Sequence, residues 1–223
     1  MPMNVIYRGS ADLPEIIPVF PLSGALLLPR GQLPLNIFES RYLAMTEDSL
    51  ANRRMFAMIQ PDPNAPENEH GPGVYKVGCL GRLISFSETD DGRFLITLVG
   101  ISRFTIAEEL PNRRGYRWVR ADFSAFASDL DPTPHPNGVE REALLSALRA
   151  YFTGQRIDAN WDAIQRIPAD QLIVTLAGAC PFEPAEKQLL LEAATEADRA
   201  ATLMALLQMG ASSIELPPNR NLS

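Results

Sequence analysis

Four prolines interrupt a strongly apolar stretch of the chain between residues 18 and 42. The stretch reads PVFPLSGALLLPRGQLPLNIFESRY, with prolines at positions 18, 21, 29 and 34. Because proline has no backbone N–H to donate to a neighbouring strand, the stretch is incompatible with one long central strand. We therefore predict several short, bent strands that end near Ile37 and Phe38, followed by a helix that starts at Ser40.

The pattern up to about residue 123 is that of a β-rich region, with alternating apolar residues and frequent turns. Residues 60–73 form a proline- and acid-rich loop that we expect to be too polar and too broken to bury anything. The Asp91-Gly92 step favours a hairpin turn between two strands, because glycine adopts the positive φ that such a turn needs. The expected elements are strands at Met55–Ile59, Val74–Phe86, Arg93–Val99, Arg103–Glu108 and Tyr116–Phe123, and a helix from Ser40 to about Leu50.

A helical period replaces the alternation beyond the segment 129–138, in which three prolines disfavour both helix and sheet. The expected helices are Val139–Phe152, a short one capped by Asp158, one after Pro168, one from Pro184, and one capped by Thr195 that ends at Gly210. We therefore predict an α+β chain with a β-rich part at 1–128, a linker at 129–138, a small helical bundle at 139–210 and a tail at 211–223.

Charge and composition narrow the classes of partner. The formal net charge is −7, and residues 123–223 contain seven basic and thirteen acidic residues, which argues against general nucleic-acid binding. A basic cluster is formed by Arg113, Arg114, Arg117 and Arg120. A solvated, ion-paired strand edge explains this cluster better than a nucleic-acid-binding patch does. No apolar run approaches the roughly 20 residues of a membrane-spanning helix, so we expect no membrane partner. With only two cysteines and no signal-like N-terminus, the cytoplasm is the expected location.

Catalytic motifs are absent from the sequence. Its only lysines are Lys76 and Lys187, and neither follows the glycine-rich loop that a P-loop nucleotide site requires. We expect Lys187 to be exposed among acidic residues that raise its pKa, which is the wrong direction for a Ser–Lys catalytic pair. The sequence contains no zinc-binding motif and no nucleophile elbow. We therefore expect no catalytic residue, cofactor or metal, and an unrecognised hydrolase with a carboxylate pair is the least favoured alternative.

Several segments, in order, resemble the N-terminal domain of Lon proteases. They are Pro18–Tyr42, Val77–Ile84, Asp91–Ile106 and Pro181–Glu192 followed by Arg199, and together the resemblance covers roughly residues 15–210. The segment Ile37–Tyr42 is most similar to the stand-alone bacterial proteins of this group. The resemblance implies a twisted, barrel-like, mostly antiparallel β-domain followed by a small helical bundle.

The resemblance also implies a non-catalytic module that recognises polypeptide substrates. The strand-to-helix transition that matches the proposed recognition region gives Leu27, Phe38, Glu39, Arg41 and Tyr42 as candidate peptide contacts. The competing interpretation is that Phe38 and Tyr42 pack in the core while Glu39 and Arg41 fix the start of the helix. A second hypothesis is an adaptor that docks on a separate protease or chaperone through the acidic helical half.

Overall fold

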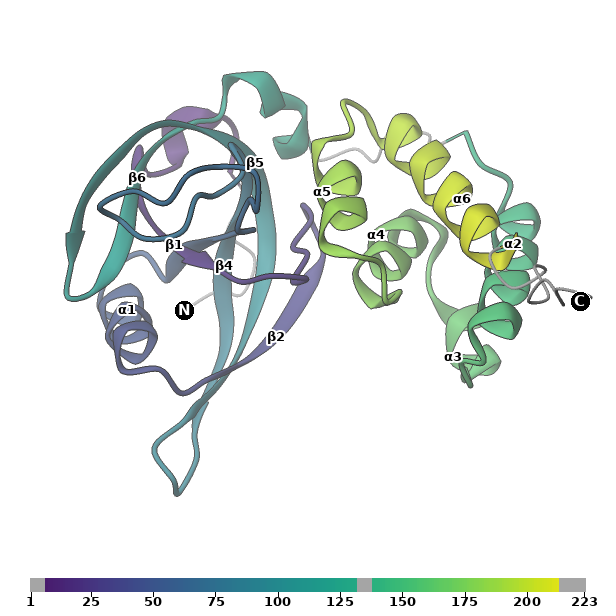
Figure 1. The fold of residues 1–223 in the computed structure, drawn as a ribbon, viewed down its shortest axis with the longest axis horizontal. Helices are drawn as coiled ribbons and strands as arrows, with labels where there is room; N and C mark the ends of the chain where they lie inside the picture. The colour runs from purple at the N-terminus through teal and green to yellow at the C-terminus, as the bar shows by residue number, and fades with distance from the viewer. Residues whose placement is uncertain (1–6, 132–137, 213–223) are drawn as a thin grey trace, which may run out of the picture. The chain divides into compact units, whose positions relative to one another are not determined.

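The computed structural model describes residues 7–131 and 138–212 (Figure 1). Residues 132–137 of the predicted linker and residues 213–223 of the predicted tail lie outside this described part. The chain divides into two compact units. We call Met1–Pro134 with Val174–Glu192 the β-rich unit, and His135–Ile173 with Ala193–Ser223 the helical unit.

Six strands of the β-rich unit form one mostly antiparallel sheet, ordered β2-β5-β4-β3-β1-β6. A further pairing of the second half of β5 with β6 makes the sheet ring-like, while β2 pairs with the first residues of β5 along the same edge, opposite β4. The single parallel pair joins β1 to β3. The strands are β1 (Ile16–Pro21), β2 (Gln32–Ile37), β3 (Met55–Ile59), β4 (Val77–Glu88), β5 (Phe94–Arg113) and β6 (Tyr116–Asp122).

The short strands β1 and β2 confirm the interpretation of the proline-spaced stretch, and the α+β class is as predicted. The prediction of a separate strand at Arg103–Glu108 was wrong, because these residues continue β5. Shifts of register near Leu80 and Ile106 mark bulges in the pairing, and bulges increase the local twist of a sheet. This twist lets one strand pair with β2 and β4 near its start and with β6 near its end.

The helices of the β-rich unit follow local sequence signals. α1 (Ser40–Ala51) matches the predicted helix, and α5 (Pro184–Glu192) begins at a proline, which suits a first helical turn. Two 3₁₀ helices, η1 (Ser10–Asp12) and η2 (Ser124–Leu130), complete this part together with the second half of α4 (Ala169–Ala179).

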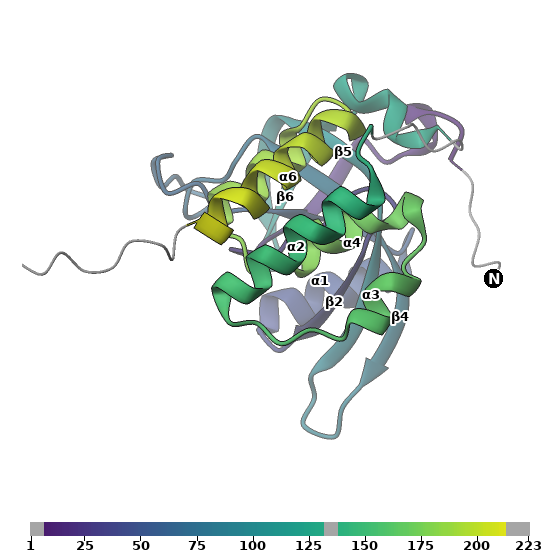
Figure 2. The same ribbon diagram turned by 90° about the vertical axis from the view of Figure 1, so that its right-hand side faces the viewer.

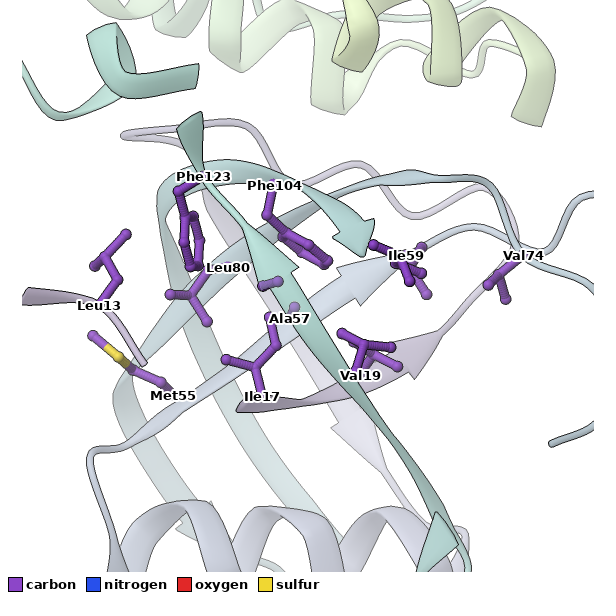
Figure 3. Packing of buried hydrophobic residues seen from close by; sticks show 13 residues of the cluster. Leu13, Ile17, Val19, Met55, Ala57, Ile59, Val74, Leu80, Phe104 and Phe123 are labelled. Atoms are coloured by element: carbon purple, nitrogen blue, oxygen red, sulfur yellow. The ribbon is translucent and has the colours of Figure 1, made fainter. Parts of the chain in front are cut away.

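The interior of the sheet holds a continuous cluster of apolar side chains. Figure 3 shows Ile17 and Val19 of β1, Ala57 and Ile59 of β3, and Phe104 of β5 gathered between the strands. Each of these five side chains is nearly or completely buried. Burial of a large aliphatic or aromatic side chain stabilises a fold by about 1.5–3 kcal/mol, so this cluster contributes substantially to the stability of the β-rich unit.

Residues 60–73 are better anchored than the sequence suggested. The expectation that this loop buries nothing was wrong at its first residue, because Gln60 is buried. Its side-chain amide donates to the Pro184 carbonyl at 3.0 Å and to Oε1 of Gln188 at 3.1 Å. Further along the loop, the buried Arg117 donates to the carbonyls of His70 at 2.8 Å and Pro72 at 2.6 Å.

The helical unit contains α2 (Arg141–Gln155), α3 (Trp161–Arg166), the first residues of α4, and α6 (Glu196–Ser212). Figure 2 shows α2 and α6 side by side, and Gly210 of α6 lies against the ring of Tyr151. Thr195 caps α6 as predicted, with its hydroxyl accepting from the Asp198 N–H at 3.0 Å.

The predicted cap of the short helix α3 was wrong by two residues. Asn160, not Asp158, accepts from the Ala163 N–H at 3.0 Å. Both residue types cap helices well, so residue type alone did not distinguish the two positions.

Gly100 allows the segment around Leu28 to cross closely over β5, and its replacement tests this packing. In a Gly100→Ala variant the new methyl group would overlap the Leu28 carbonyl, whose carbon would be 2.7 Å away. We expect a loss of about 1–3 kcal/mol in the free energy of unfolding, measured by urea denaturation. Gly9→Ala is the matched control, because its methyl group meets nothing within 4 Å and should change stability little. Equal stability of the two variants would contradict this account.

Arg103 makes the most extensively bonded ion pair of the β-rich unit. Only 2% of its side chain is exposed, its Nε and Nη2 donate to the two oxygens of Asp129 at 2.9 and 2.8 Å, and its Nη1 donates to the Leu191 carbonyl at 3.1 Å. The guanidinium also lies 4.4 Å from the centre of the Phe126 ring. One side chain therefore joins η2 and the end of α5 to β5.

Arg103→Met should leave the Asp129 carboxylate buried without its partner. We expect a loss of about 3–5 kcal/mol in the free energy of unfolding, measured by urea denaturation followed by circular dichroism. Arg93→Met removes an exposed ion pair with Asp91 and serves as the control, since such pairs contribute little. A similarly small effect for both variants would show that the buried pair does not hold these elements together.

Candidate functional site

A groove of about 530 Å³ opens on the β-rich unit beside α1, and we call it the α1 groove. Its lining comes from four parts of the chain: β1 with the residue Pro14 before it, the C-terminal turns of α1 with the segment up to the start of β3, the end of β5 with the turn that follows, and β6. The lining residues are Pro14, Ile16, Pro18, Asp48, Ser49, Asn52, Arg53, Met55, Arg113, Arg114, Tyr116 and Trp118.

The β1–β6 pair supplies apolar and aromatic side chains to the groove. Pro18 stands directly opposite Trp118 in the antiparallel register, so their side chains share one face of the sheet. Ile16 lies two residues before Pro18 on the same face, and 38% of its side chain is exposed. A large exposed aliphatic side chain beside a tryptophan offers a surface that an apolar ligand can cover.

A two-residue turn fixes the rim of the groove to α1. Arg114 and Gly115 both have positive φ, 50° and 84°, which is the conformation of the tight turns that suit hairpins. The Tyr116 hydroxyl donates to Oδ2 of Asp48 at 2.6 Å, and Arg114 donates to Oδ1 of the same carboxylate. Burial, and then the hydrogen bond to Asp48, raise the pKa of Tyr116 well above its usual value, so the phenol stays protonated and keeps donating.

Two arginines of the groove have no ion-pair partner within residues 7–131 and 138–212. They are Arg53, at the exposed end of α1, and Arg113, whose guanidinium lies 5.1 Å from the centre of the Trp118 ring. Asp48, the acidic residue of the lining, is already engaged by Tyr116 and Arg114. The groove therefore combines an apolar floor with positive charge that no carboxylate of the described residues pairs with.

The structure places the five residues predicted from sequence in two kinds of surroundings, with Leu27 and Tyr42 buried and Phe38, Glu39 and Arg41 exposed. Leu27 and Tyr42 are 2% and 5% exposed, and the Tyr42 ring centre lies 4.0 Å from that of Phe20, as expected for core residues. Phe38 is 63% exposed and has the guanidinium of Arg93 5.7 Å from its ring centre.

Glu39 and Arg41 form an exposed ion pair of 2.8 Å at the start of α1, and the Arg41 guanidinium covers the Tyr42 ring at 4.6 Å. The structure thus brings Glu39, Arg41 and Tyr42 together at one place. A peptide contact at the exposed members, Phe38, Glu39 and Arg41, stays a prediction.

A smaller pocket of about 190 Å³ lies on the Tyr42 side of Tyr116. Arg41, Tyr42 and the anchored residues His70–Pro72 line it, together with Tyr116 and the buried Arg117. Arg117 is engaged with the loop carbonyls and with Glu109 at 3.7 Å, so its charge supports the loop.

The residues that line the α1 groove were not predicted as a site. Asp48, Arg53 and Trp118 are far apart in the sequence and share no motif. The available signal was Gly115 between two strand-like runs, which indicates a hairpin that carries Arg113 and Arg114 to one rim.

The sequence-based expectation for Lys187 was wrong about the exposure of its side chain and about the direction of its pKa shift. The side chain is partly buried, its Nζ donates to the Gly24 carbonyl at 2.7 Å, and burial lowers its pKa. Nearby Cys180 is buried, and burial raises the pKa of its thiol to about 12, so the thiol is neutral at physiological pH.

In the described part of the chain, no three side chains from histidine, cysteine, aspartate and glutamate gather as a metal site would require. No helix there is long and apolar enough to cross a membrane.

A family model described as the ATP-dependent protease La (LON) substrate-binding domain matches residues 16–209. The chain belongs to this family. The match covers both units, and it confirms the resemblance inferred from the ordered motifs.

Relatives and solved structures agree with this membership. The chain is similar to Lon protease of Desulfosudis oleivorans, with 31% identity over 98 residues, or 43% of this chain and 12% of that protein. It is also similar to Lon protease 1 of Bdellovibrio bacteriovorus, with 26% identity over 200 residues, or 86% of this chain and 24% of that protein. The chain thus spans no more than about a quarter of the length of these Lon proteases.

Two solved structures share the fold of this LON-family chain. A Lon N-terminal domain protein from Xanthomonas campestris has a TM-score of 0.57 at 20% identity, covering 85% of this chain and 97% of that one. The N-terminal domain of Mycobacterium avium complex Lon protease has a TM-score of 0.58 at 16% identity, covering 86% and 97%. At these identities the likeness establishes the fold, and the α+β class predicted from sequence is confirmed.

The Tyr116→Phe variant tests the contact between the rim and α1. Removing the hydroxyl leaves Asp48 without one donor, so we expect the free energy of unfolding to fall by about 1–3 kcal/mol at pH 7. Tyr75→Phe is a suitable control, because its hydroxyl makes no hydrogen bond with any residue that the structure describes.

The same variant should also change how the stability of the chain depends on pH. Folding raises the pKa of Tyr116 above its unfolded value of about 10, so its contribution to stability is complete below pH 10 and is lost as the pH rises above it. Urea denaturation between pH 8 and 11 should therefore show a shallower decline for Tyr116→Phe than for the original chain, and parallel declines would refute the proposed contact.

Proposed function

We propose that this chain is a non-catalytic module that binds polypeptide segments in the α1 groove. The family description names substrate binding, and the two relatives described above are Lon proteases. The observation that carries the proposal is the combination, in one groove, of the exposed Ile16 and the half-buried Trp118 with two arginines that form no ion pair within the described residues. This combination suits a polypeptide, whose side chains are partly apolar and whose backbone offers carbonyl acceptors.

The size and rigidity of the groove support this proposal. Its volume lies within the range of about 300–1,000 Å³ that is usual for ligand sites. The bonds of Tyr116 and Arg114 to Asp48 hold the rim in place before a ligand arrives. Such preorganisation reduces the entropy that a flexible peptide and its site lose together on binding.

Binding through side chains is favoured over addition of a strand. β1, at the floor of the groove, already pairs with β3 on one side and β6 on the other. The edge strand β2 pairs only with β5 in the described residues, but Pro34 lies in its middle and removes one backbone donor. Proline in an edge strand discourages further pairing. The Phe38, Glu39 and Arg41 surface at the end of β2 is therefore the secondary proposal for a contact.

We propose that the module breaks no bond itself and needs no cofactor, since the sequence has no nucleotide or metal motif and Lys187 is held by the hydrogen bond that it donates to the Gly24 carbonyl. We propose a cytoplasmic location because its two cysteines are buried thiols that form no disulfide within the described residues. Docking of the acidic C-terminal half, residues 123–223, on a separate protease or chaperone stays the alternative hypothesis.

Tryptophan fluorescence tests peptide binding at the groove directly. The chain has two tryptophans, Trp118 in the groove and Trp161 in α3, so Trp161→Phe leaves a single reporter at the site. A tryptophan-free peptide of about ten residues, roughly 33 Å long when extended, would carry leucines and valines spaced by serines. We expect a saturable change in Trp118 emission with this peptide and none with a peptide of serine and glycine alone.

The reciprocal variant separates the groove from the rest of the chain. Trp118→Phe keeps only Trp161, and its emission should not change when the leucine peptide is added. The absence of any response from Trp118, together with no heat of binding by calorimetry, would contradict the proposed function. A response from Trp161 alone would move the binding site away from the groove.

A further inference from the structure

We infer that the α1 groove selects polypeptide segments in which acidic side chains stand next to bulky apolar ones. This inference rests on the proposed function and specifies the class of substrate. The observation behind it is that the apolar floor is bordered by Arg53 and Arg113, which have no carboxylate partner among the residues that the structure describes.

Arg113 is positioned to meet a ligand on the floor of the groove. It is the last residue of β5 and pairs with Tyr116 across the turn, so the backbone on both sides is fixed. Its guanidinium lies 5.1 Å from the centre of the Trp118 ring, which orients the planar group without satisfying its N–H donors. A carboxylate beside an apolar residue on Trp118 would receive charge-assisted hydrogen bonds from it.

Arg53 supplies a second, independent positive charge from the end of α1. Its backbone carbonyl accepts from Arg82 at 3.4 Å, while its exposed side chain has no ion pair within the described ranges. The neighbouring Asp48 does not neutralise it, because that carboxylate receives the Tyr116 hydroxyl and the Arg114 guanidinium.

The net charge of the chain cannot produce a preference for acidic peptides, so such a preference would come from the arginines of the groove. The formal net charge is −7, so at long range the protein repels an acidic peptide. At physiological salt, interactions beyond about 8 Å are strongly screened, and only the nearest charges matter. A preference for acidic peptides would therefore report the groove itself and would not reflect the overall charge.

Three peptides that differ only in the residues between their leucines test the inference. The spacers are glutamate, glutamine or lysine, and binding is measured by Trp118 emission in the Trp161→Phe background. We expect the glutamate peptide to bind about threefold to tenfold more tightly than the glutamine peptide, and the lysine peptide to bind most weakly. This preference should disappear at about 1 M salt, where the screening length is about 3 Å.

The double substitution Arg53→Gln and Arg113→Gln identifies the residues responsible. It should bring the ratio of the dissociation constants of the glutamine and glutamate peptides close to one, and this ratio within the variant is the readout. Arg166→Gln is the matched control, because Arg166 is exposed at the end of α3, outside the groove, and forms no ion pair in the described part of the chain. It should keep the full preference.

The possible results separate the two proposals. Equal binding of all three peptides would overturn the charge preference and leave the proposed function intact, whereas no binding of any peptide would contradict the proposed function itself. Tighter binding of a single-stranded oligonucleotide than of the glutamate peptide would assign the groove to nucleic acid and overturn the inference. A Trp118 spectrum that changes with protein concentration alone would assign it to a second copy of the chain, with the same consequence.

Discussion

The backbone pairing of β5 is the constraint on which the rest of the β-rich unit depends. Its first residues pair with β2 and β4 at once, its middle with β4, and its last with β6. Because β6 also pairs with β1, this one strand brings the end of β5 next to β1 and α1. The α1 groove exists because of that closure, since its floor comes from β1 and β6 and its rim from the turn between β5 and β6.

Local signals predicted many of the elements because each signal acts within a few residues. The prolines of β1 and β2, the Asp-Gly turn at Gly92 and the Thr195 cap all specify backbone conformation where they stand. The continuity of β5 was missed because its partner changes along its length, and a change of partner leaves no mark in the alternation of the strand itself.

The candidate site was less predictable for a related reason. The residues predicted from sequence lie within one contiguous stretch, and two of them, Leu27 and Tyr42, proved to be buried. The groove instead combines residues near positions 16, 50 and 115, which only the closed sheet brings together. The basic cluster around Arg117 was equally hard to interpret from sequence, because its arginines make different contacts in the structure. Arg117 is buried and anchors a loop, Arg114 pairs with α1, and Arg113 lies over Trp118 without an ion pair among the described residues.

These different contacts indicate that the β-rich unit uses one set of arginines to stabilise its fold and another set to line the proposed binding groove. Arginine can serve both, because its planar group with five donors suits buried pairs as well as exposed ligands. Arg103 and Arg117 direct their donors inward to a carboxylate and to loop carbonyls, so their loss should damage the fold. Arg53 and Arg113 are exposed and support no other element through an ion pair in the described ranges, so their charges can change with little effect on stability. Variation at these two positions would therefore change the charge of the proposed binding groove while the closed sheet stays intact.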